Sequence, residues 1–387
     1  MNASSENTIH PRVKFPGNWV EQRRTQFTKL HPSRFKFHVP EYGVHVKWNS
    51  RDHRKGRHPV LRSLVPEKHR FKRGRFHLFG IELANVSWWV AFVFTLACLV
   101  WVVNGTFVLF PEIENVYVVG YSALIGGTLF EIGGYLMVVE ALNTPHVACF
   151  GYAVEKVVEN AAEDGLVVFR SLKHRRGYTK GSIQVNNNTD IELSQIELSG
   201  CPHDGEAFSG PGPHAVENKI GDDSSKDDAC NCSVSKEWRW WGYEFRDMGY
   251  TGSFIQFVAA TVFWIATISG VPNLIAEDAI ALLDVFFWAP QVVGSIGFTV
   301  SSYIFMLETQ PSWYRIQPKK IGWHVAFWNL IGSIGFLLSG IFGFWEFSPN
   351  SSDLIRWGSS FSTFWGSISF LVGSYLQFLE VINRYPN

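Results

Sequence analysis

One acidic residue stands in the middle of a long apolar stretch of the sequence. Glu131 lies in IGGTLFEIGGYLMVVEALN, and a charge near the centre of a bilayer costs about 2.5 kcal/mol or more. We therefore expect its carboxyl group either to form a neutral structural hydrogen bond or to face a wet cavity with a role in transport. Side-chain amides in the other apolar stretches are candidate partners in a polar pathway or buried hydrogen-bond site: Asn104, Gln256, Gln291 and Asn329.

Three further acids recur at one position of an internal repeat. IGGTLFEIGGYLMVVEALN, VGSIGFTVSSYIFMLETQ and WGSISFLVGSYLQFLEVIN share a Gly, then a Phe four residues later, a Tyr nine later and a Glu fourteen later. The negative end of a helix dipole disfavours an acid there, so each Glu needs a compensating partner. Two interpretations stay open: structural ion pairs, with Arg315 and Arg384 near two of the acids, or an acidic ring that attracts cations. The repeated residues are Gly126, Phe130, Tyr135 and Glu140; Gly294, Phe298, Tyr303 and Glu308; and Gly366, Phe370, Tyr375 and Glu380.

The remaining reactive residue types form no recognised catalytic or metal-binding motif. HExxH, GxSxG, a phosphate-binding glycine loop and the Ser-His-Asp order are all missing from the sequence, so we predict that the protein is not an enzyme. The cysteines include no CxxC pair, and the CxH and CxC groups have no established zinc spacing. We expect no metal and no cofactor. The residues concerned are Cys201, His203, His214, Cys230 and Cys232.

Six apolar stretches must position the acids and amides. The hydrocarbon core of a bilayer, about 30 Å thick, needs roughly 20 helical residues to cross it, and helices satisfy every backbone donor and acceptor within one segment. The spans are predicted at approximately 87–109, 116–139, 252–272, 283–307, 322–345 and 357–380. The sequence therefore predicts an all-α, multi-pass membrane protein with six transmembrane helices.

The spans pair into three helical hairpins that repeat one unit. The odd spans agree too, because a Phe stands thirteen residues before a Gly in each. All three copies cross the membrane in the same sense, so we expect a pseudo-three-fold bundle about an axis along the membrane normal. The hairpins occupy residues 83–143, 251–310 and 311–387, the last with a short tail. The odd-span pairs are Phe92 and Gly105, Phe257 and Gly270, and Phe327 and Gly340.

The distribution of Lys and Arg predicts the orientation. The connections after spans one, three and five contain a single Lys or Arg, which is Arg356. The others lie before span one, in the long middle loop, between spans four and five, or after span six. Positive-inside asymmetry therefore places both termini in the cytoplasm. The lengths of the spans suit the plasma membrane and endomembranes alike, so the organelle stays open.

The charged residues are concentrated in two segments outside the spans. Residues 1–82 are basic and show no helical or strand period, which predicts a mostly disordered cytoplasmic region. Residues 144–250 form a cytoplasmic loop whose acidic part, 183–235, we also expect to be disordered. The stretch EKHRFKRGRFHLF either anchors the orientation or contacts anionic lipid headgroups at about 1 kcal/mol per base; nucleic acid is not an expected partner. Its candidate headgroup contacts are Arg70, Lys72, Arg73 and Arg75.

Four segments carry a resemblance to a known family. FIQFVAATVFWIATISGVP, APQVVGSIGFTVSSYIFMLETQ, GWHVAFWNLIGSIGF and STFWGSISFLVGSYLQFLE resemble a family of uncharacterised fungal multi-pass integral membrane proteins. The repeated GSxxFxxxSYLxxxE hairpin is also similar to the YrhK domain, a two-helix membrane module of unknown activity. The resemblance covers roughly residues 81–142 and 238–384. It implies six spans and a fungal origin, and it implies no substrate and no functional residues.

Two classes of function remain compatible with the sequence. The internal repeat and the acid Glu131 favour a transporter- or channel-like protein whose path follows the pseudo-three-fold axis. The alternative is a non-transporting scaffold that presents its charged cytoplasmic segments to lipids or to partner proteins. A lipid-modifying enzyme is a third class, and no recognised motif supports it. The oligomeric state and the role of the middle loop are not predicted.

Overall fold

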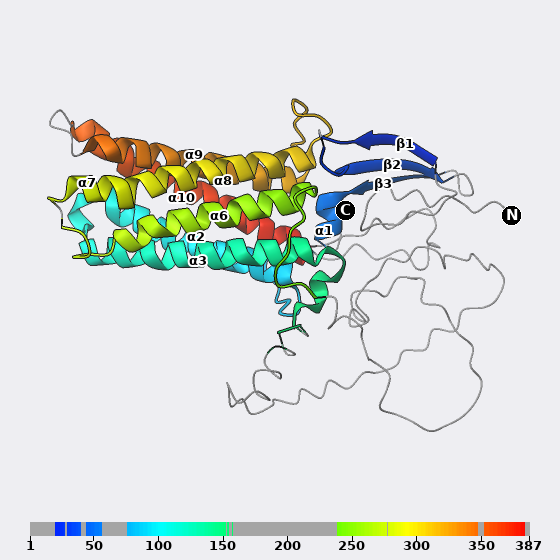
Figure 1. Ribbon diagram of the computed structural model, residues 1–387, viewed down its shortest axis with the longest axis horizontal. Helices are drawn as coiled ribbons and strands as arrows, with labels where there is room; N and C mark the ends of the chain where they lie inside the picture. Colours follow the sequence, from blue (N-terminus) through cyan, green and yellow to red (C-terminus); the bar gives the residue numbers. More distant parts are fainter. Residues whose placement is uncertain are drawn as a thin grey trace, which may run out of the picture.

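Six helices, each long and apolar enough to cross a membrane, pack side by side in the computed structural model (Figure 1). It describes residues 20–27, 29–39, 44–55, 76–151, 153, 154, 157, 238–276, 278–346 and 352–383. The predicted all-α membrane fold with six spans is confirmed. The spanning helices are α2 (Val86–Leu109), α3 (Val116–Leu142), α6 (Met248–Ser269), α8 (Ala289–Thr309), α9 (Ile321–Glu346) and α10 (Asp353–Ile382).

The fourth span is longer than α8 alone. The helix α7 (Ile280–Leu283) and a π-helical turn (Asp284–Trp288) lead directly into α8, so the apolar span runs from Ile280 to Thr309. Pro290 lies within this continuous helical span, where it has no backbone N–H to donate to the preceding turn. The change to wider π turns just before this proline is the irregular part of the span.

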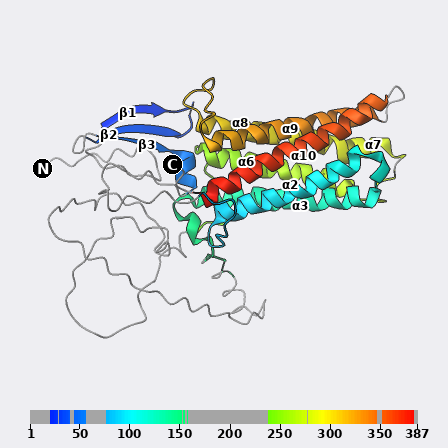
Figure 2. The ribbon, with the colours of Figure 1, turned by 180° about the vertical axis from the view of Figure 1, so that it is seen from behind.

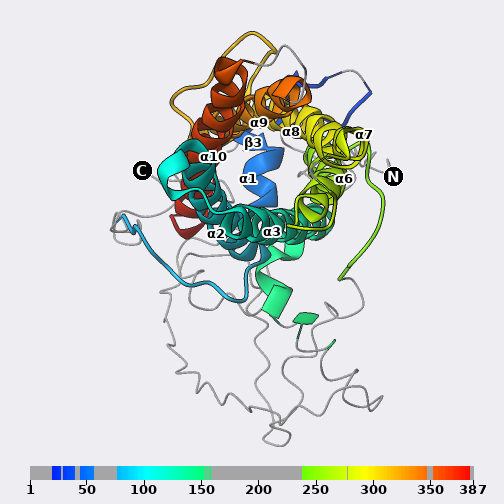
Figure 3. The same ribbon diagram turned by 90° about the vertical axis from the view of Figure 1, so that its left-hand side faces the viewer.

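The spanning helices form a closed ring in chain order. Each hairpin packs internally, α2 with α3, α6 with α8 and α9 with α10, and each also packs on the next hairpin, α3 on α6, α8 on α9 and α10 on α2. The contact between the last and first spans closes the ring. Seen from the back the same order continues without a break (Figure 2), and the view along the bundle shows the three hairpins around one axis (Figure 3).

Aromatic rings fill the centre of the ring of helices. The repeated residues Phe130, Phe298 and Phe370 contact one another in a triangle, with ring centroids 6.0, 5.8 and 6.3 Å apart. Because one Phe comes from each hairpin, the triangle marks the pseudo-three-fold axis. Three rings from the odd spans pack against this triangle, and the six together are called the aromatic layer below. These additional rings are Trp101, Phe263 and Phe336.

Small residues let neighbouring spanning helices pack closely against one another. A Cβ atom built on Gly294 of α8 would lie 2.7 Å from the Cβ atom of Phe263 and 2.9 Å from a carbonyl oxygen of α6. A side chain at this position would therefore force the second hairpin open. Van der Waals contact of this kind is the main attraction between helices in a membrane.

The N-terminal region corrects one prediction. Residues 1–82 were expected to be mostly disordered, yet β1 (Val20–Thr25), β2 (Arg34–Val39) and β3 (Val44–Asn49) form an antiparallel sheet in the order β1-β2-β3. Phe35 and Phe37 of β2 and Trp48 of β3 are buried together. These apolar side chains alternate with bases along the strands, so the two-residue period of a half-buried strand is present but short.

The sheet leads directly into a short helix at the same end of the bundle. Helix α1 (Ser50–Arg54) follows β3 without an intervening loop, and the sheet lies just beyond the helix bundle (Figures 1 and 2). Backbone and side-chain contacts tie the sheet region to the bundle: the His31 amide donates to the Arg246 carbonyl at 2.7 Å, and the Arg34 guanidinium donates to the Thr309 carbonyl. The loop segment 183–235 lies outside the described residues.

Candidate functional site

Helix α1 places three cations on one face. The Asn49 side chain caps the helix by accepting the amide of Asp52 at 2.7 Å, which fixes where α1 begins. Arg51, Arg54 and Lys55 follow at spacings of three and four residues, the distances at which side chains share one side of a helix. Residues 50–55 are called the plug, because α1 lies on the axis of the ring of spanning helices (Figure 3), at the end of the bundle next to the sheet (Figure 1).

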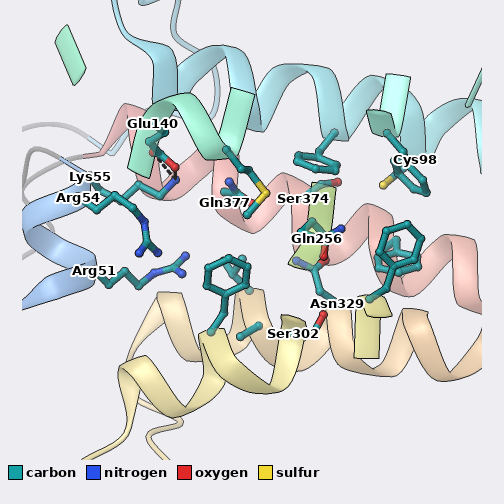
Figure 4. A pocket seen from close by; sticks show the side chains of 18 residues that line it. Arg51, Arg54, Lys55, Cys98, Glu140, Gln256, Ser302, Asn329, Ser374 and Gln377 are labelled. Atoms are coloured by element: carbon teal, nitrogen blue, oxygen red, sulfur yellow. Dashed lines mark hydrogen bonds and ion pairs between the residues drawn. The ribbon is translucent and has the colours of Figure 1, made fainter. Parts of the chain in front are cut away.

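Each cation of the plug pairs with one of the three repeated acids, which are called the acid triad. Arg51 and Arg54 each form two hydrogen bonds with a carboxylate in the forked geometry that suits a guanidinium, and the Lys55 ammonium contacts both oxygens of its partner. Figure 4 shows the lysine pair and the two arginines converging at the mouth of the bundle. The pairs are Arg51 with Glu380 at 2.6 and 3.2 Å, Arg54 with Glu308 at 2.8 and 2.8 Å, and Lys55 with Glu140 at 2.7 and 3.0 Å.

Hydroxyl groups complete two of these carboxylate sites. Ser50 of the plug donates to Glu308 at 2.8 Å, and Ser87 in the first turn of α2 donates to Glu140. The acids come from the ends of α3, α8 and α10, one per hairpin, so the triad has the same pseudo-three-fold arrangement as the aromatic layer. The plug itself has no such symmetry, since one short helix supplies all three cations.

The ion pairs are fully buried. Glu308 has no exposed surface, and the other five charged groups of the three pairs are at most 6% exposed. Removing one partner of such a pair costs about 3–5 kcal/mol, because the other charge then lies buried without compensation. Three acids meet three cations, so the assembly is neutral as a whole. The arrangement is therefore stable only while the plug is in place or while other cations replace it.

The three cations are not equally well stabilised. Burial lowers the pKa of Arg51 and of Arg54, but the attraction of their carboxylate partners outweighs this, so the pKa of each arginine is raised. For Lys55 burial is again the largest effect, and the nearby arginines add to it, so the pKa of this lysine is lowered despite Glu140. Lys55 is therefore the one plug cation whose pKa is lowered.

A small cavity with a mixed apolar and polar lining lies behind the plug on the bundle axis. This axial cavity has about 40 Å³ of space open to water-sized molecules, enough for a few waters. The plug cations line one side, and the repeated Phe residues of the aromatic layer line the other. Its polar lining residues also appear in Figure 4; they are Gln256, Ser302, Asn329, Ser374 and Gln377.

One lining amide is buried without a protein partner. Gln377 is 6% exposed, and among the described residues no group forms a hydrogen bond with its side-chain amide. A buried amide without a hydrogen bond costs free energy in an apolar surrounding. The Gln377 amide is therefore open to a hydrogen bond with water or a polar ligand in the axial cavity. It lies on α10 three residues before Glu380, between the acid triad and the aromatic layer.

The structure separates the residues that were expected to form a polar pathway. Gln256 and Asn329 line the axial cavity. Gln291 is buried, but its amide donates to Ser339 at 3.2 Å and it does not line this cavity. Asn104 donates to the Val119 carbonyl at 2.7 Å. Side-chain amides therefore reach the axis from α6 and α9.

Glu131 lies away from the axis. Its carboxylate accepts a hydrogen bond from Thr261 of α6 at 3.0 Å on the outer side of the bundle, where the residue is partly exposed. None of the amides considered as partners is bonded to it, and it does not line the axial cavity. Of the two interpretations of Glu131, the geometry agrees with a hydrogen bond and not with a wet cavity.

The acid triad has partners other than those expected. Ion pairs with Arg315 and Arg384 were considered, but the acids are paired with the plug instead. Arg315 lies in the exposed connection between α8 and α9, with its guanidinium over the ring of Tyr314. Arg384 is outside the described residues, as are the headgroup candidates Arg70, Lys72, Arg73 and Arg75 and the cysteines and histidines of residues 201–232.

The plug cations were not singled out from the sequence. Their spacing within NSRDHRK, after an Asn that can cap a helix, is a recognisable signal for three bases on one helix face. The count of three bases matches the count of three repeated acids. Average composition hides this signal, because the surrounding region contains many other bases.

Comparisons of the chain with family models, curated proteins and solved structures find no match. The resemblance to fungal multi-pass membrane proteins and to the YrhK domain therefore stays a prediction.

Proposed function

We propose that this protein is a channel- or transporter-like membrane protein that conducts cations along the axis of its helix ring, with the plug as the gate at one end. The observation that carries the proposal is the pairing of a symmetric ring of acids with a single asymmetric segment. A ring of carboxylates around an axis is an established means of attracting cations to a pore. With the plug in place, its own cations occupy that ring.

The cost of burying charge supports a gate over a purely structural lock. Replacing buried ion pairs by apolar side chains of similar size is often neutral or stabilising, so three buried pairs are an inefficient way to attach a sheet to a bundle. Three buried ion pairs do suit a contact that has to open, because the plug and the acid triad become two hydrated, charged surfaces when they separate. The axial cavity supports the same proposal, because polar groups continue beyond the acids toward the aromatic layer.

Two barriers close the axis in the conformation described. The first is the plug, and the second is the aromatic layer, whose rings meet on the axis. Conduction needs both to open, the first by undocking and the second by rotation of the rings. The plug end carries the sheet and the C-terminal end of α10, and the distribution of bases supports placing this end in the cytoplasm.

The proposal is tested by cation flux in sealed proteoliposomes. The plug variant Arg51→Gln/Arg54→Gln/Lys55→Gln removes the charges that hold the gate and leaves the acid triad intact. We expect potassium efflux from it to exceed that of the wild type by about tenfold or more, since each 1.4 kcal/mol of lost docking energy raises the undocked population about tenfold. Chloride efflux should not rise, because the triad is negative.

Two matched variants complete the flux experiment. In the combined variant all six charged residues of the three pairs are replaced by Gln, and we expect potassium efflux to fall back toward the wild-type value because the ring no longer attracts cations. Glu131→Gln, outside the axis, should behave as the wild type. Equal potassium efflux from the wild type and the plug variant, with both correctly folded, would overturn the proposal.

A scaffold is the second candidate. Its specific support is the attachment of the sheet region to the bundle by the backbone contact between His31 and Arg246 and by Arg34. In a scaffold the buried pairs would hold this sheet in a fixed place at the membrane. Deleting residues 183–235 should then abolish the cellular phenotype, whereas Glu131→Gln should leave it intact, and flux should stay low in every variant.

A further inference from the structure

The acid triad is built to accept N–H donors from several separate cationic groups. Its carboxylates come from three different helices, and each one faces its own guanidinium or ammonium group at 2.6–2.8 Å. The cations reach them from positions i, i+3 and i+4 of one short helix. Neighbours at these spacings have Cβ atoms about 5–6 Å apart, so the site matches charges that are linked to one another by flexible chains.

The geometry disfavours a single metal ion as the natural occupant. Within the described residues no three His, Cys, Asp or Glu side chains approach closely enough to hold one metal ion. Each of the three carboxylates instead has its own cation of the plug, at 2.6–2.8 Å. One small ion would neutralise one carboxylate and leave the other two uncompensated.

The cavity behind the triad supplies a second, independent indication of a ligand. The amide of Gln377 is more than nine-tenths buried and points into the axial cavity without a bond to any described protein group. Gln256 and Asn329 add amides to the same wall, and Ser302 adds a hydroxyl. Amide and hydroxyl oxygens accept hydrogen bonds from ammonium groups. A cationic chain that enters through the triad would therefore find further acceptors beyond it.

We propose that the acid triad and the axial cavity bind a linear polyamine, a flexible chain that carries several ammonium groups, in place of the plug. This inference deepens the proposed function and rests on its assumption that the plug can undock. The polyamine places one ammonium on each carboxylate, as the plug does with its three cations, and its apolar methylene segments lie along the rings near the axis. Arg51, Arg54 and Lys55 thus act as an internal competitor for the polyamine.

The inference is tested by titrating spermidine into purified full-length protein and measuring the heat of binding. We expect the plug variant to bind spermidine at least tenfold more tightly than the wild type, in which the plug occupies the site. The combined variant, without the acids, should show no binding. Butylamine, with one ammonium group, and magnesium chloride serve as control ligands, and both should bind much more weakly than spermidine.

A second route displaces the plug without changing any charge. A Cβ atom added to Gly249 would lie 1.5 Å from Nη1 of Arg54, and one added to Gly322 would lie 2.5 Å from Nε of Arg51. The new Cβ atoms also lie 3.1 Å from the Oε1 atoms of Glu308 and Glu380, and an ammonium group, which is smaller than a guanidinium, still has room beside these carboxylates. Gly249→Ala/Gly322→Ala should therefore bind spermidine more tightly than the wild type, with the triad and the plug charges all present. A shift of the melting temperature by spermidine reports binding in the folded protein and shows that each variant is folded.

The outcomes separate this inference from the proposed function. Spermidine binding by the plug variant without any gain in potassium flux would support the polyamine site and remove the conduction proposal. A gain in potassium flux without spermidine binding would support the conduction proposal and remove the polyamine site. Equal binding of spermidine and magnesium, or binding that survives removal of all three acids, would overturn the polyamine site.

Discussion

The acid triad and Glu131 show two different ways in which one membrane protein accommodates acids within its helices. The triad lies inside the ring of helices, where each carboxylate is buried and paired with a cation from a distant segment. Glu131 lies on the outer side of the ring, partly exposed, with a threonine as its hydrogen-bond partner. The position of an acid relative to the axis, and not its depth along the helix alone, decides whether it pairs with a cation of the plug or forms a local hydrogen bond.

The difference has a cause in the repeat. Glu140, Glu308 and Glu380 are buried at equivalent positions of the repeat whose Phe residues meet on the axis, one from each hairpin. The position of Glu131 is occupied by Thr299 and Leu371 in the other two hairpins, so the symmetry of the bundle does not direct it to the axis. An acid required by a shared central site recurs in each copy, whereas an acid found in one copy serves a local contact.

The largest expected effect is at Glu308, which accepts three hydrogen bonds from two residues of the plug, Arg54 and Ser50. Glu308→Gln keeps the size of the side chain but leaves Arg54 buried without a counter-charge. We expect the free energy of unfolding to fall by about 3–5 kcal/mol. Denaturation of the detergent-solubilised protein, followed by circular dichroism, measures the change.

The double variant Arg54→Leu/Glu308→Leu is the control for Glu308→Gln. It removes both charges together, and buried ion pairs replaced in this way are often neutral in stability. We expect it to recover most of the loss, which shows that the cost arises from an uncompensated charge. A double variant as unstable as Glu308→Gln would mean that packing around Glu308, and not charge pairing, holds the plug.

An intermediate effect is expected at Gly249, beside the plug. The side chain of Gly249→Ala would occupy the space of the Arg54 guanidinium, and such overpacking typically costs about 1–3 kcal/mol. Because the clash is with the plug, we expect the plug to undock while the bundle stays folded. Hydrogen exchange should then increase at residues 50–55 and stay unchanged in the centre of the spans. Gly358→Ala, near the other end of the bundle and with no atom closer than 3.4 Å to the new Cβ, is the control.

The sequence allowed the bundle to be predicted better than the site. The number of spans was predicted from apolar length, and a pseudo-three-fold bundle of three hairpins was predicted from the residues that recur at fixed spacing. The acid triad was recognised as a set, because Glu140, Glu308 and Glu380 occupy equivalent positions. The cations that pair with these acids were not recognised. The ion pair between residues 51 and 380 joins segments more than three hundred positions apart, and no local sequence pattern indicates such a contact.

The N-terminal sheet was missed for a different reason. Its strands are six residues long, and their alternation of Phe35, Phe37 and Trp48 with bases is too short to stand out in a segment with a high content of charge. The polarity of Gln256 and Asn329 also did not predict that these two residues lie near the axis. Only the rotation of each helix in the closed ring decides whether an amide faces the cavity or a neighbouring helix.

The smallest expected effect is at Glu131. This variant tests most directly the contrast between the acids of the triad and Glu131. Glu131→Gln keeps an oxygen that can accept the hydrogen bond from Thr261 and removes any cost of a carboxylate near hydrocarbon. Since the net contribution of such a hydrogen bond is about 0.5–1.5 kcal/mol and the bond is retained, we expect the free energy of unfolding to stay within about 1 kcal/mol of the wild type or to rise slightly. The same denaturation experiment that measures Glu308→Gln measures this variant. A loss as large as that of Glu308→Gln would show that Glu131 also has a charged or hydrated partner, and the contrast between axial and outer acids would then fail.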